Sequence, residues 1–177
     1  MPLLTPAESY AAVYDNFAWD IPAQVNMGLQ VSDRHLAGGA DRPALIVAAP
    51  GLSPRTYSFG EIVRLSNQLA NVFVAKGLRR GNRVGIMLSQ SVEAAIAHIA
   101  AWKMGAISIP LFKLFGEESL SFRLQDSGAR LVVTDADQLP KLEPLRDALP
   151  ALKTVLVVGH DGADDGGNAD FWGAMGA

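Results

Sequence analysis

The chain has 177 residues, of which 49% are hydrophobic and 19% charged, a composition typical of one globular domain with a substantial core. Its formal net charge of −3 argues against a nucleic-acid surface, and the lack of cysteine excludes a disulfide framework, a thiolate zinc site and a cysteine nucleophile. No apolar run reaches the ~20 residues of a membrane span, and no secretory signal is recognised at the N-terminus. These features predict a soluble, cytoplasmic protein.

Residues 1–40 are expected to form a helical N-terminal arm. Thr5 and Glu8 have the spacing of a capping box, in which each side chain accepts a hydrogen bond from the backbone of the other residue. Pro6 would then occupy the first helical position, where proline is favoured. A first helix is therefore predicted to run from this point to about Asn16.

A second helix of the arm is predicted over residues 25–36. Tyr10, Tyr14 and Phe17 recur at near-helical spacing in the first helix and its end. Because aromatic stripes usually bury a large apolar area, we expect this arm to pack on the body of the protein.

A β-hairpin is predicted to follow the arm, with strands over residues 44–48 and 55–57. The intervening segment 50–54 contains two prolines and a glycine, the composition of a turn. Ser58 and Glu61 form a second capping-box pattern, which predicts the start of a long helix directly after the hairpin.

Three predicted helices end at a glycine, and an apolar run follows each of them. The glycines are Gly77, Gly105 and Gly128, and the runs are residues 84–88, 107–111 and 131–134. Glycine adopts the left-handed conformation of a helix C-cap easily, and a short apolar run after it is typical of a buried strand. A fourth repeat is predicted from a helix over residues 137–148, broken early by Pro140, and a strand over 154–158.

Helices and strands that alternate in this way predict an α/β fold with a largely parallel sheet. Right-handed crossovers would place the helices on both faces of that sheet. We therefore expect three segments: the helical arm at 1–40, an α/β subdomain with its hairpin at 41–159, and a linker at 160–177.

The segment after Gly159 is acidic and rich in glycine, so it is predicted to be an exposed linker. Phe171 and Trp172 follow it and are expected to be exposed, which favours a natural chain that continues beyond residue 177. A calcium site is a weaker interpretation of this segment, because the spacing of a calcium loop and its closing glutamate are absent. Its candidate ligands would be Asp161, Asp164, Asp165 and Asp170.

The chain contains neither of two common glycine-rich phosphate loops, nor the G-x-S-x-G pattern of a nucleophilic serine. His35, His98 and His160 are far apart in the sequence and show no metal-ligand spacing. His98 lies four residues before Trp102 on one predicted helix, where it is expected either to pack in the helix or to lie at a solvent edge.

Two sets of cations are candidates for contacting an anion. Arg79, Arg80 and Arg83 cluster around a predicted turn, for which a solvated loop is favoured over a phosphate contact. Lys113 follows the carboxyl end of a predicted strand, which is the side on which ligands of parallel sheets bind. A single lysine there is a weak signal.

Several stretches of the chain, taken as a set, resemble one known family. They are WDIP at 19–22 with Asn26, YSFGE at 57–61, KGLRRGNRVGI at 76–86, AWKMGA at 101–106, IPLFKLFG at 109–116 and LQDSGA at 124–129. The set resembles the N-terminal portion of the adenylate-forming acyl-CoA synthetases, from about Tyr14 onward. The first stretch resembles the acetyl- and medium-chain branch of that family.

This resemblance implies an enzyme of fatty acid metabolism that converts a carboxylic acid and ATP, with Mg, into an acyl-adenylate and then transfers the acyl group to CoA. In the family a Ser/Thr/Gly-rich loop holds the phosphates, later motifs bind adenine and ribose, and a small C-terminal domain brings a lysine. We recognise none of these motifs in the 177 residues. No catalytic, cofactor-binding or metal-binding residue is therefore assigned, and the chain alone is predicted to be inactive.

Its expected partner is the remainder of the synthetase or a complementing fragment. One alternative is a non-catalytic α/β interaction module, or half of a split or degenerate synthetase that binds its complement through Phe171 and Trp172. A second alternative is an unrelated α/β protein with a small-ligand site within residues 80–160, where no residues that would build one are recognised. The acyl substrate and the oligomeric state are not predicted.

Overall fold

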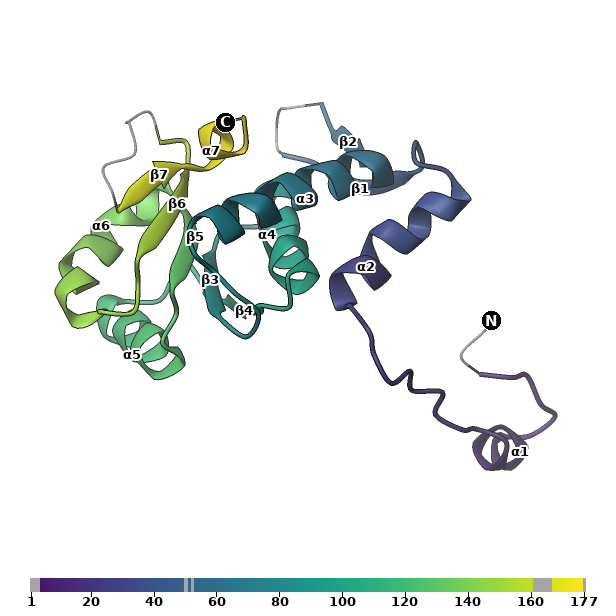
Figure 1. Cartoon of the computed structure of the whole chain (residues 1–177). Coiled ribbons are helices and arrows are strands. Elements are labelled where there is room, and N and C mark those ends of the chain that lie inside the picture. The colour runs from purple at the N-terminus through teal and green to yellow at the C-terminus, as the bar shows by residue number, and fades with distance from the viewer. Residues whose placement is uncertain (1–3, 50, 52, 161–166, 177) are drawn as a thin grey trace.

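The computed structural model describes residues 4–49, 51, 53–160 and 167–176, and its centre is a five-stranded parallel sheet of order β4-β3-β5-β6-β7 (Figure 1). The strands are β3 (Arg83–Met87), β4 (Ile107–Pro110), β5 (Leu131–Asp135), β6 (Thr154–Val158) and β7 (Asn168–Asp170). β1 (Pro43–Val47) and β2 (Arg55–Ser58) form a separate antiparallel hairpin, as predicted. Pro50 and Leu52 of the predicted turn lie outside the described residues.

Helices cover both faces of the large sheet, which confirms the predicted α/β class. On one face lie α3 (Phe59–Ala75), α4 (Val92–Lys103) and α7 (Phe171–Gly176), and on the other lie α5 (Glu117–Ser127), α6 (Leu139–Leu142) and the 3-10 helix η3 (Glu143–Ala148). Successive residues of a strand point to opposite faces, so Ile86 joins the first core and Met87 the second.

The predicted caps of the body are confirmed. Glu61 N donates to Ser58 Oγ at 3.2 Å and Ser58 N donates to Glu61 Oε2 at 2.8 Å, which is the complete capping box of α3. Gly77, Gly105 and Gly128 have φ angles of +85°, +73° and +58°, the left-handed region that favours glycine after a helix.

The arm helices differ from the prediction. α1 (Tyr10–Asp15) begins after Ser9, whose Oγ accepts from Ala12 N at 3.2 Å, so the predicted cap at Thr5 is wrong. The second predicted helix, over 25–36, is divided into two elements. α2 (Met27–Val31) is capped by Asn26 and ends before Ser32, and the 3-10 helix η1 (Asp33–Gly38) follows it. Ser32 Oγ donates to the carbonyl of Gly28 at 2.6 Å, a local bond that competes with the helix.

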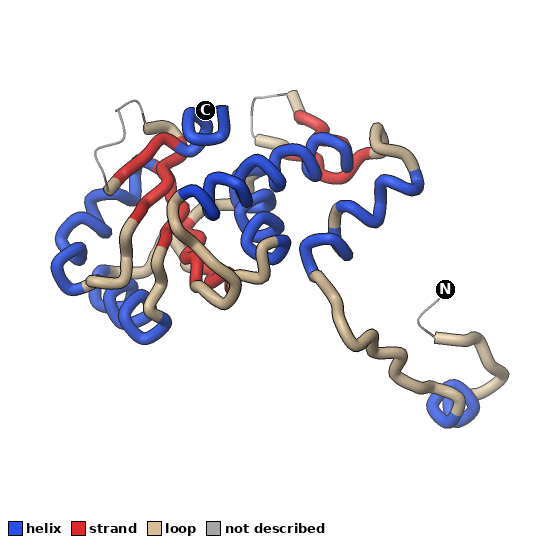
Figure 2. Tube along the Cα trace, in the orientation of Figure 1, coloured by secondary structure: helices blue, strands red, loops and turns tan. Residues whose placement is uncertain are grey.

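The aromatic residues of α1 do not pack on the body. Tyr10 is 83% exposed and Tyr14 is 70% exposed, and the two rings stack on each other with centroids 6.2 Å apart. Figures 1 and 2 show α1 away from the sheet, joined to α2 by an extended segment. The expected packing is therefore wrong for α1, whereas α2 and η1 do contact α4, where Asp33 pairs with Lys103 at 2.6 Å.

The segment after β6 also differs from its prediction. Residues 168–170 form β7, which pairs in parallel with β6, and α7 follows directly. Phe171 is completely buried in the core beside α3, so the prediction that it is exposed is wrong, while Trp172 is 38% exposed and donates to Glu93 Oε1 at 3.2 Å. Asp170 caps α7 by accepting from Gly173 N at 2.5 Å, and Asp161, Asp164 and Asp165 lie outside the described residues.

The predicted helix over 137–148 is three short pieces: η2 (Ala136–Gln138), α6 and η3. The first break, between η2 and α6, comes just before Pro140, which agrees with the predicted early break; Pro140 itself lies in the first turn of α6, where proline is tolerated. The change to η3 comes after Leu142, and Pro144 occupies the first turn of η3.

Among the described residues, no helix combines the length and the apolar character required to cross a lipid bilayer.

Candidate functional site

The carboxyl ends of the parallel strands share one edge of the sheet, where ligands of such folds bind. A pocket of about 520 Å³ opens there, at the ends of β3 and β4, between β1 and α4. We call it the carboxyl-edge pocket. Its size lies in the usual range of small-molecule sites, about 300–1,000 Å³.

The walls of the carboxyl-edge pocket are mainly apolar. β1 supplies Leu45 and Val47, α4 supplies Ala95, and the loop after β4 supplies Phe112. The polar lining groups come from residues 89–91 and His98, and among the described residues no lysine, arginine, aspartate or glutamate lines the pocket. The pocket can therefore contact a neutral group, but it offers no side-chain charge to a triphosphate.

His98 is held in this wall by two neighbours. Its Nδ1 lies 3.0 Å from Ser108 Oγ, and that oxygen accepts a hydrogen bond from Trp102 Nε1 at 2.9 Å. Burial lowers the pKa of His98, which favours the neutral ring. The expected packing beside Trp102 is confirmed, with ring centroids 5.6 Å apart, but sequence reasoning missed Ser108.

The other two histidines take no part in this arrangement. His35 stacks on Phe59, with ring centroids 4.7 Å apart, and His160 follows β6. Within the described ranges, no group of three or more His, Cys, Asp or Glu side chains is placed to hold a metal ion.

Lys113 lies on the carboxyl edge, after β4. Its Nζ is 2.6 Å from Asp135 Oδ2 at the end of β5, so its charge is already compensated. Lys141 Nζ donates to the carbonyl of Lys113 at 2.5 Å and so holds the loop after β4 to α6. The sequence indicated the position of Lys113 but not its partner, because Asp135 belongs to a different strand.

The arginine cluster lies on the opposite, amino edge of the sheet. Arg79 donates to the carbonyls of Leu78 at 2.8 Å and Val74 at 3.3 Å, and Arg83 donates to the carbonyls of Ser127 and Gly128. These two cations therefore stabilise the C-terminal ends of α3 and α5, where the helix dipole favours positive charge.

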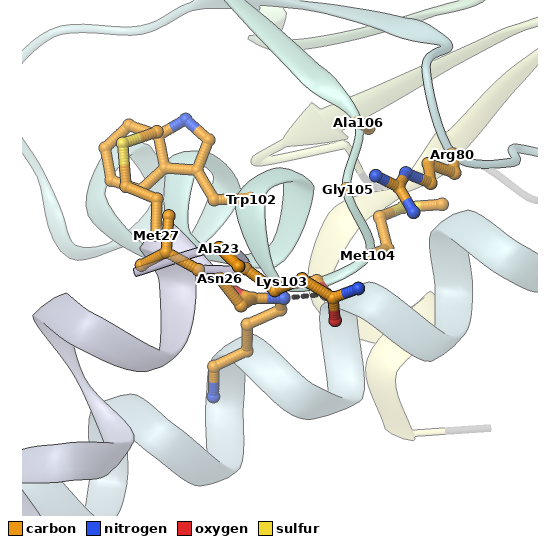
Figure 3. A pocket seen from close by; sticks show the side chains of 11 residues that line it. Ala23, Asn26, Met27, Arg80, Trp102, Lys103, Met104, Gly105 and Ala106 are labelled. Atoms are coloured by element: carbon orange, nitrogen blue, oxygen red, sulfur yellow. Dashed lines mark hydrogen bonds between the residues drawn. The ribbon is translucent and has the colours of Figure 1, made fainter. Parts of the chain in front are cut away.

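Arg80 lies beside a second pocket, of about 920 Å³, which we call the arm pocket (Figure 3). The pocket lies between residues 23–27 of the arm and the end of α4. Asn26 holds the two parts together, because its Nδ2 donates to the carbonyl of Lys103 at 2.8 Å. Sequence reasoning missed this pocket, since its two walls are far apart along the chain.

Residues 32–174 match the family of AMP-binding enzymes, and the chain belongs to this family. It is 32% identical over 171 residues to the acetyl-coenzyme A synthetase of Bacillus subtilis (strain 168), a match that covers 91% of this chain and 29% of the relative. It is 34% identical over 134 residues to the acetyl-coenzyme A synthetase of Thiobacillus denitrificans, covering 75% of this chain and 20% of that relative.

Two solved structures have a similar fold. The crystal structure of the anthranilate CoA ligase AuaEII in complex with anthranoyl-AMP matches with a TM-score of 0.77 and 26% identity, over 88% of this chain and 28% of that chain. The acyl-CoA synthetase of Brucella canis matches with a TM-score of 0.78 and 26% identity, over 90% and 29%.

These matches confirm the resemblance seen in the sequence motifs: the chain corresponds to the N-terminal portion of an adenylate-forming acyl-CoA synthetase. It spans less than a third of the length of the relatives described. The motifs themselves are structural, since 57–61 includes the capping box of α3 and 101–106 is the end of α4 with Gly105.

Proposed function

We propose that this chain supplies part of the scaffold of an acyl-CoA synthetase. The whole enzyme would convert a carboxylic acid, ATP and CoA into acyl-CoA, AMP and pyrophosphate, with Mg as a further cofactor, in the fatty acid metabolism of the cytoplasm. A carboxylate is a poor electrophile, and its adenylate carries a good leaving group. The observation that supports this proposal most is the shared fold with two CoA ligases over 88% and 90% of the chain.

The described residues do not fit the ATP and Mg that the family uses. ATP carries several negative charges, which proteins usually meet with clustered N–H donors, lysine or arginine. No charged residue in the described part of the chain lines the carboxyl-edge pocket, and the nearby Lys113 is paired with Asp135. We therefore assign no catalytic, cofactor-binding or metal-binding residue to this chain, and we propose that the remainder of a synthetase or a complementing fragment brings those groups.

We further propose that the chain has three segments: an arm at 1–40, the α/β subdomain at 41–159 and a linking segment at 160–177. The location of β7 and α7 in the sheet and its core means that part of the last segment also belongs to the body.

The proposal is tested with a pyrophosphate-release assay on the purified 177-residue chain, with ATP, Mg, CoA and acids from acetate to medium-chain length. We expect no release above background, because we assign none of the groups that activate the carboxylate to this chain. The acetyl-coenzyme A synthetase of Bacillus subtilis, assayed in parallel with acetate, is the positive control. Sustained turnover by the chain alone would contradict its assignment as scaffold.

A non-catalytic module, or half of a split or degenerate synthetase, is a second candidate function. The exposed aromatic residues of the arm, Tyr10, Tyr14 and Trp19, favour it because they offer an uncovered surface to a complement. Gel filtration of the chain, with and without a separately produced remainder of a related synthetase, distinguishes half of a split synthetase from a non-catalytic module. Co-elution with restored activity supports a split enzyme, and a stable monomer that does not bind the remainder supports a module. Membership of the AMP-binding family rules out the unrelated small-ligand protein.

A further inference from the structure

The hairpin of β1 and β2 has a free edge that faces the carboxyl-edge pocket. Four consecutive residues of the first strand and its end, 45–48, line that pocket, whereas no residue of β2, a strand described in full, does so. Consecutive side chains of a strand point to opposite faces, so a pocket that contacts both faces of β1 runs along its edge. The hairpin is separate from the large sheet (Figure 1), and within the described residues β2 is the only strand that pairs with β1. The outer edge of β1 therefore presents unpaired backbone groups beside the pocket.

This edge lacks the features that usually protect an exposed strand, which are charged side chains, prolines and bulges. In β1 the proline and the irregular register lie at the start, at Pro43, while residues 44–49 are all apolar. β4, at one end of the large sheet, differs. The N–H groups of Ile107 and Leu111 donate toward β3, so the amides between them that face outward include that of Pro110, which has no hydrogen to donate. Of the two edges, that of β1 is the one suited to pairing with a further strand.

Large apolar side chains are exposed on two walls of the same pocket. Ile46 of β1 is 63% exposed, and Phe112, after β4, is 71% exposed. Leu114, two residues further along that loop, is 96% exposed. No charged side chain of the described residues lines the pocket. The matching occupant is neutral and apolar and has backbone groups that pair with a strand, and an extended polypeptide segment has these properties.

The remainder of a synthetase is the source of such a segment. The chain corresponds to 29% of the acetyl-coenzyme A synthetase of Bacillus subtilis and to 28% of the anthranilate CoA ligase chain, so more than two thirds of each lies outside the match. The proposed function already assigns this remainder as the partner of the chain, and the present inference rests on that function.

We propose that the outer edge of β1 receives an extended strand from the remainder of the synthetase, and that apolar side chains of this strand fill the carboxyl-edge pocket. Backbone hydrogen bonds to β1 provide affinity, and contacts with Ile46 and Phe112 select an apolar strand. The hairpin then becomes part of a sheet of at least three strands, which is more stable than a pair.

Residue-resolved hydrogen exchange tests this proposal. The partner is the part of the Bacillus subtilis acetyl-coenzyme A synthetase that follows its match to this chain, produced separately and mixed with the 177-residue chain. In the complex, the outward-facing amides of residues 44–48 should exchange at least about tenfold more slowly than in the chain alone. The amide of Ser108, on the outer edge of β4, should exchange at the same rate in both samples.

Ile46→Lys places a charge on the proposed interface. Because Ile46 is exposed, we expect the variant to fold as wild type does and its affinity for the remainder to fall by about tenfold or more. Ile107→Lys is the matched control, since Ile107 is 54% exposed on β4 and lies outside the pocket, and it should bind as wild type does. Phe112→Lys changes the opposite wall and should also weaken binding, which keeps the test valid if Ile46→Lys does not fold. Circular dichroism verifies the fold of each variant.

The possible failures are distinguishable. If the wild-type chain does not bind the remainder, the partner assigned under the proposed function and this inference are both contradicted. If it binds but residues 44–48 stay unprotected, or if Ile46→Lys and Phe112→Lys bind as tightly as wild type, only the docking at β1 is overturned. An equal loss of affinity in Ile107→Lys has the same meaning. Protection of residues 44–48 in the chain alone that rises with its concentration would assign the edge to a second copy and would also overturn the docking.

Discussion

At the scale of single residues, His98 is the titratable group of the carboxyl-edge pocket. Trp102 Nε1 can only donate, so Ser108 Oγ accepts from it and is free to donate its own hydrogen to His98 Nδ1. With the ring neutral, as its lowered pKa favours, the remaining Nε2 then carries the hydrogen and acts as a donor. The side chain is thus suited to a hydrogen-bond acceptor in an apolar pocket.

His98 also predicts how stability changes with pH. In the folded protein its pKa is lowered by burial, while in the unfolded chain it is near the ordinary value of about 6.5. Below about pH 6.5 the unfolded chain binds a proton that the folded protein resists, so the stabilisation is complete above that pH and is lost as the pH falls. His98→Gln should therefore cost less free energy of unfolding at about pH 5.5 than at about pH 7.5.

Urea unfolding of wild type and variant at the two pH values measures this difference. Ile99→Val, on the same helix, is the control without a titrating group, and its cost should be the same at both. A cost of His98→Gln that does not depend on pH would contradict the assignment of the lowered pKa to folding.

At the scale of elements, the position of α2 depends on its close contact with α4. A Cβ added to Gly28 would lie 2.6 Å from Lys103 Cγ and 2.7 Å from the backbone nitrogen of Lys103. The absence of a side chain lets the two helices approach. The ion pair of Asp33 with Lys103 then fastens η1 beside them. Burial alone would raise the pKa of Asp33, but the hydrogen bond and the positive charge of Lys103 lower that pKa below its ordinary value.

Gly28→Ala should separate α2 from α4 and destabilise the protein by roughly 1–3 kcal/mol, the usual cost of overpacking. Gly176→Ala in α7 is the matched control, because it is also helical and a Cβ there meets no atom of the described residues within 4 Å. The control should be neutral or slightly stabilising, since alanine favours helix by about 1 kcal/mol over glycine. Equal effects of the two changes, measured by thermal unfolding, would show that the close contact at Gly28 does not limit stability.

At the scale of the whole molecule, β7 extends the sheet beside β6, and α7 adds to one of its two layers. Phe171 fills the core beside α3, and Arg146 of η3 holds the strand by donating to the carbonyl of Gly167 at 3.1 Å and to Asn168 Oδ1 at 2.5 Å. Elements of both layers therefore secure residues 168–176, and the α/β body includes them.

Phe171→Ala should destabilise the whole body by about 3–5 kcal/mol, because it leaves a cavity in a completely buried position. Trp172→Ala, at the partly exposed neighbour, should cost far less, and Phe171→Leu should recover part of the loss. Denaturant unfolding followed by circular dichroism measures all three. If Phe171→Ala cost no more than Trp172→Ala, then α7 would not belong to the same folding unit.

The sequence by itself determined the features that depend on neighbours along the chain. The capping box of Ser58 and Glu61, the glycine caps and the strands β3 to β6 each rest on contacts or periodicity within a few residues, so the fold class and its helical layers could be predicted. The family motifs are such local features as well.

Only the tertiary structure decided the features that join distant segments. β7 has three residues, too few for a periodic pattern, and it forms because β6 offers an edge for pairing. The arm pocket depends on Asn26 meeting Lys103, and the wall of the carboxyl-edge pocket on Ser108 meeting His98. Closing the loop between two distant segments costs conformational entropy, and these contacts offset that cost only when the whole sheet and its layers have assembled. No local pattern in the sequence therefore predicts them.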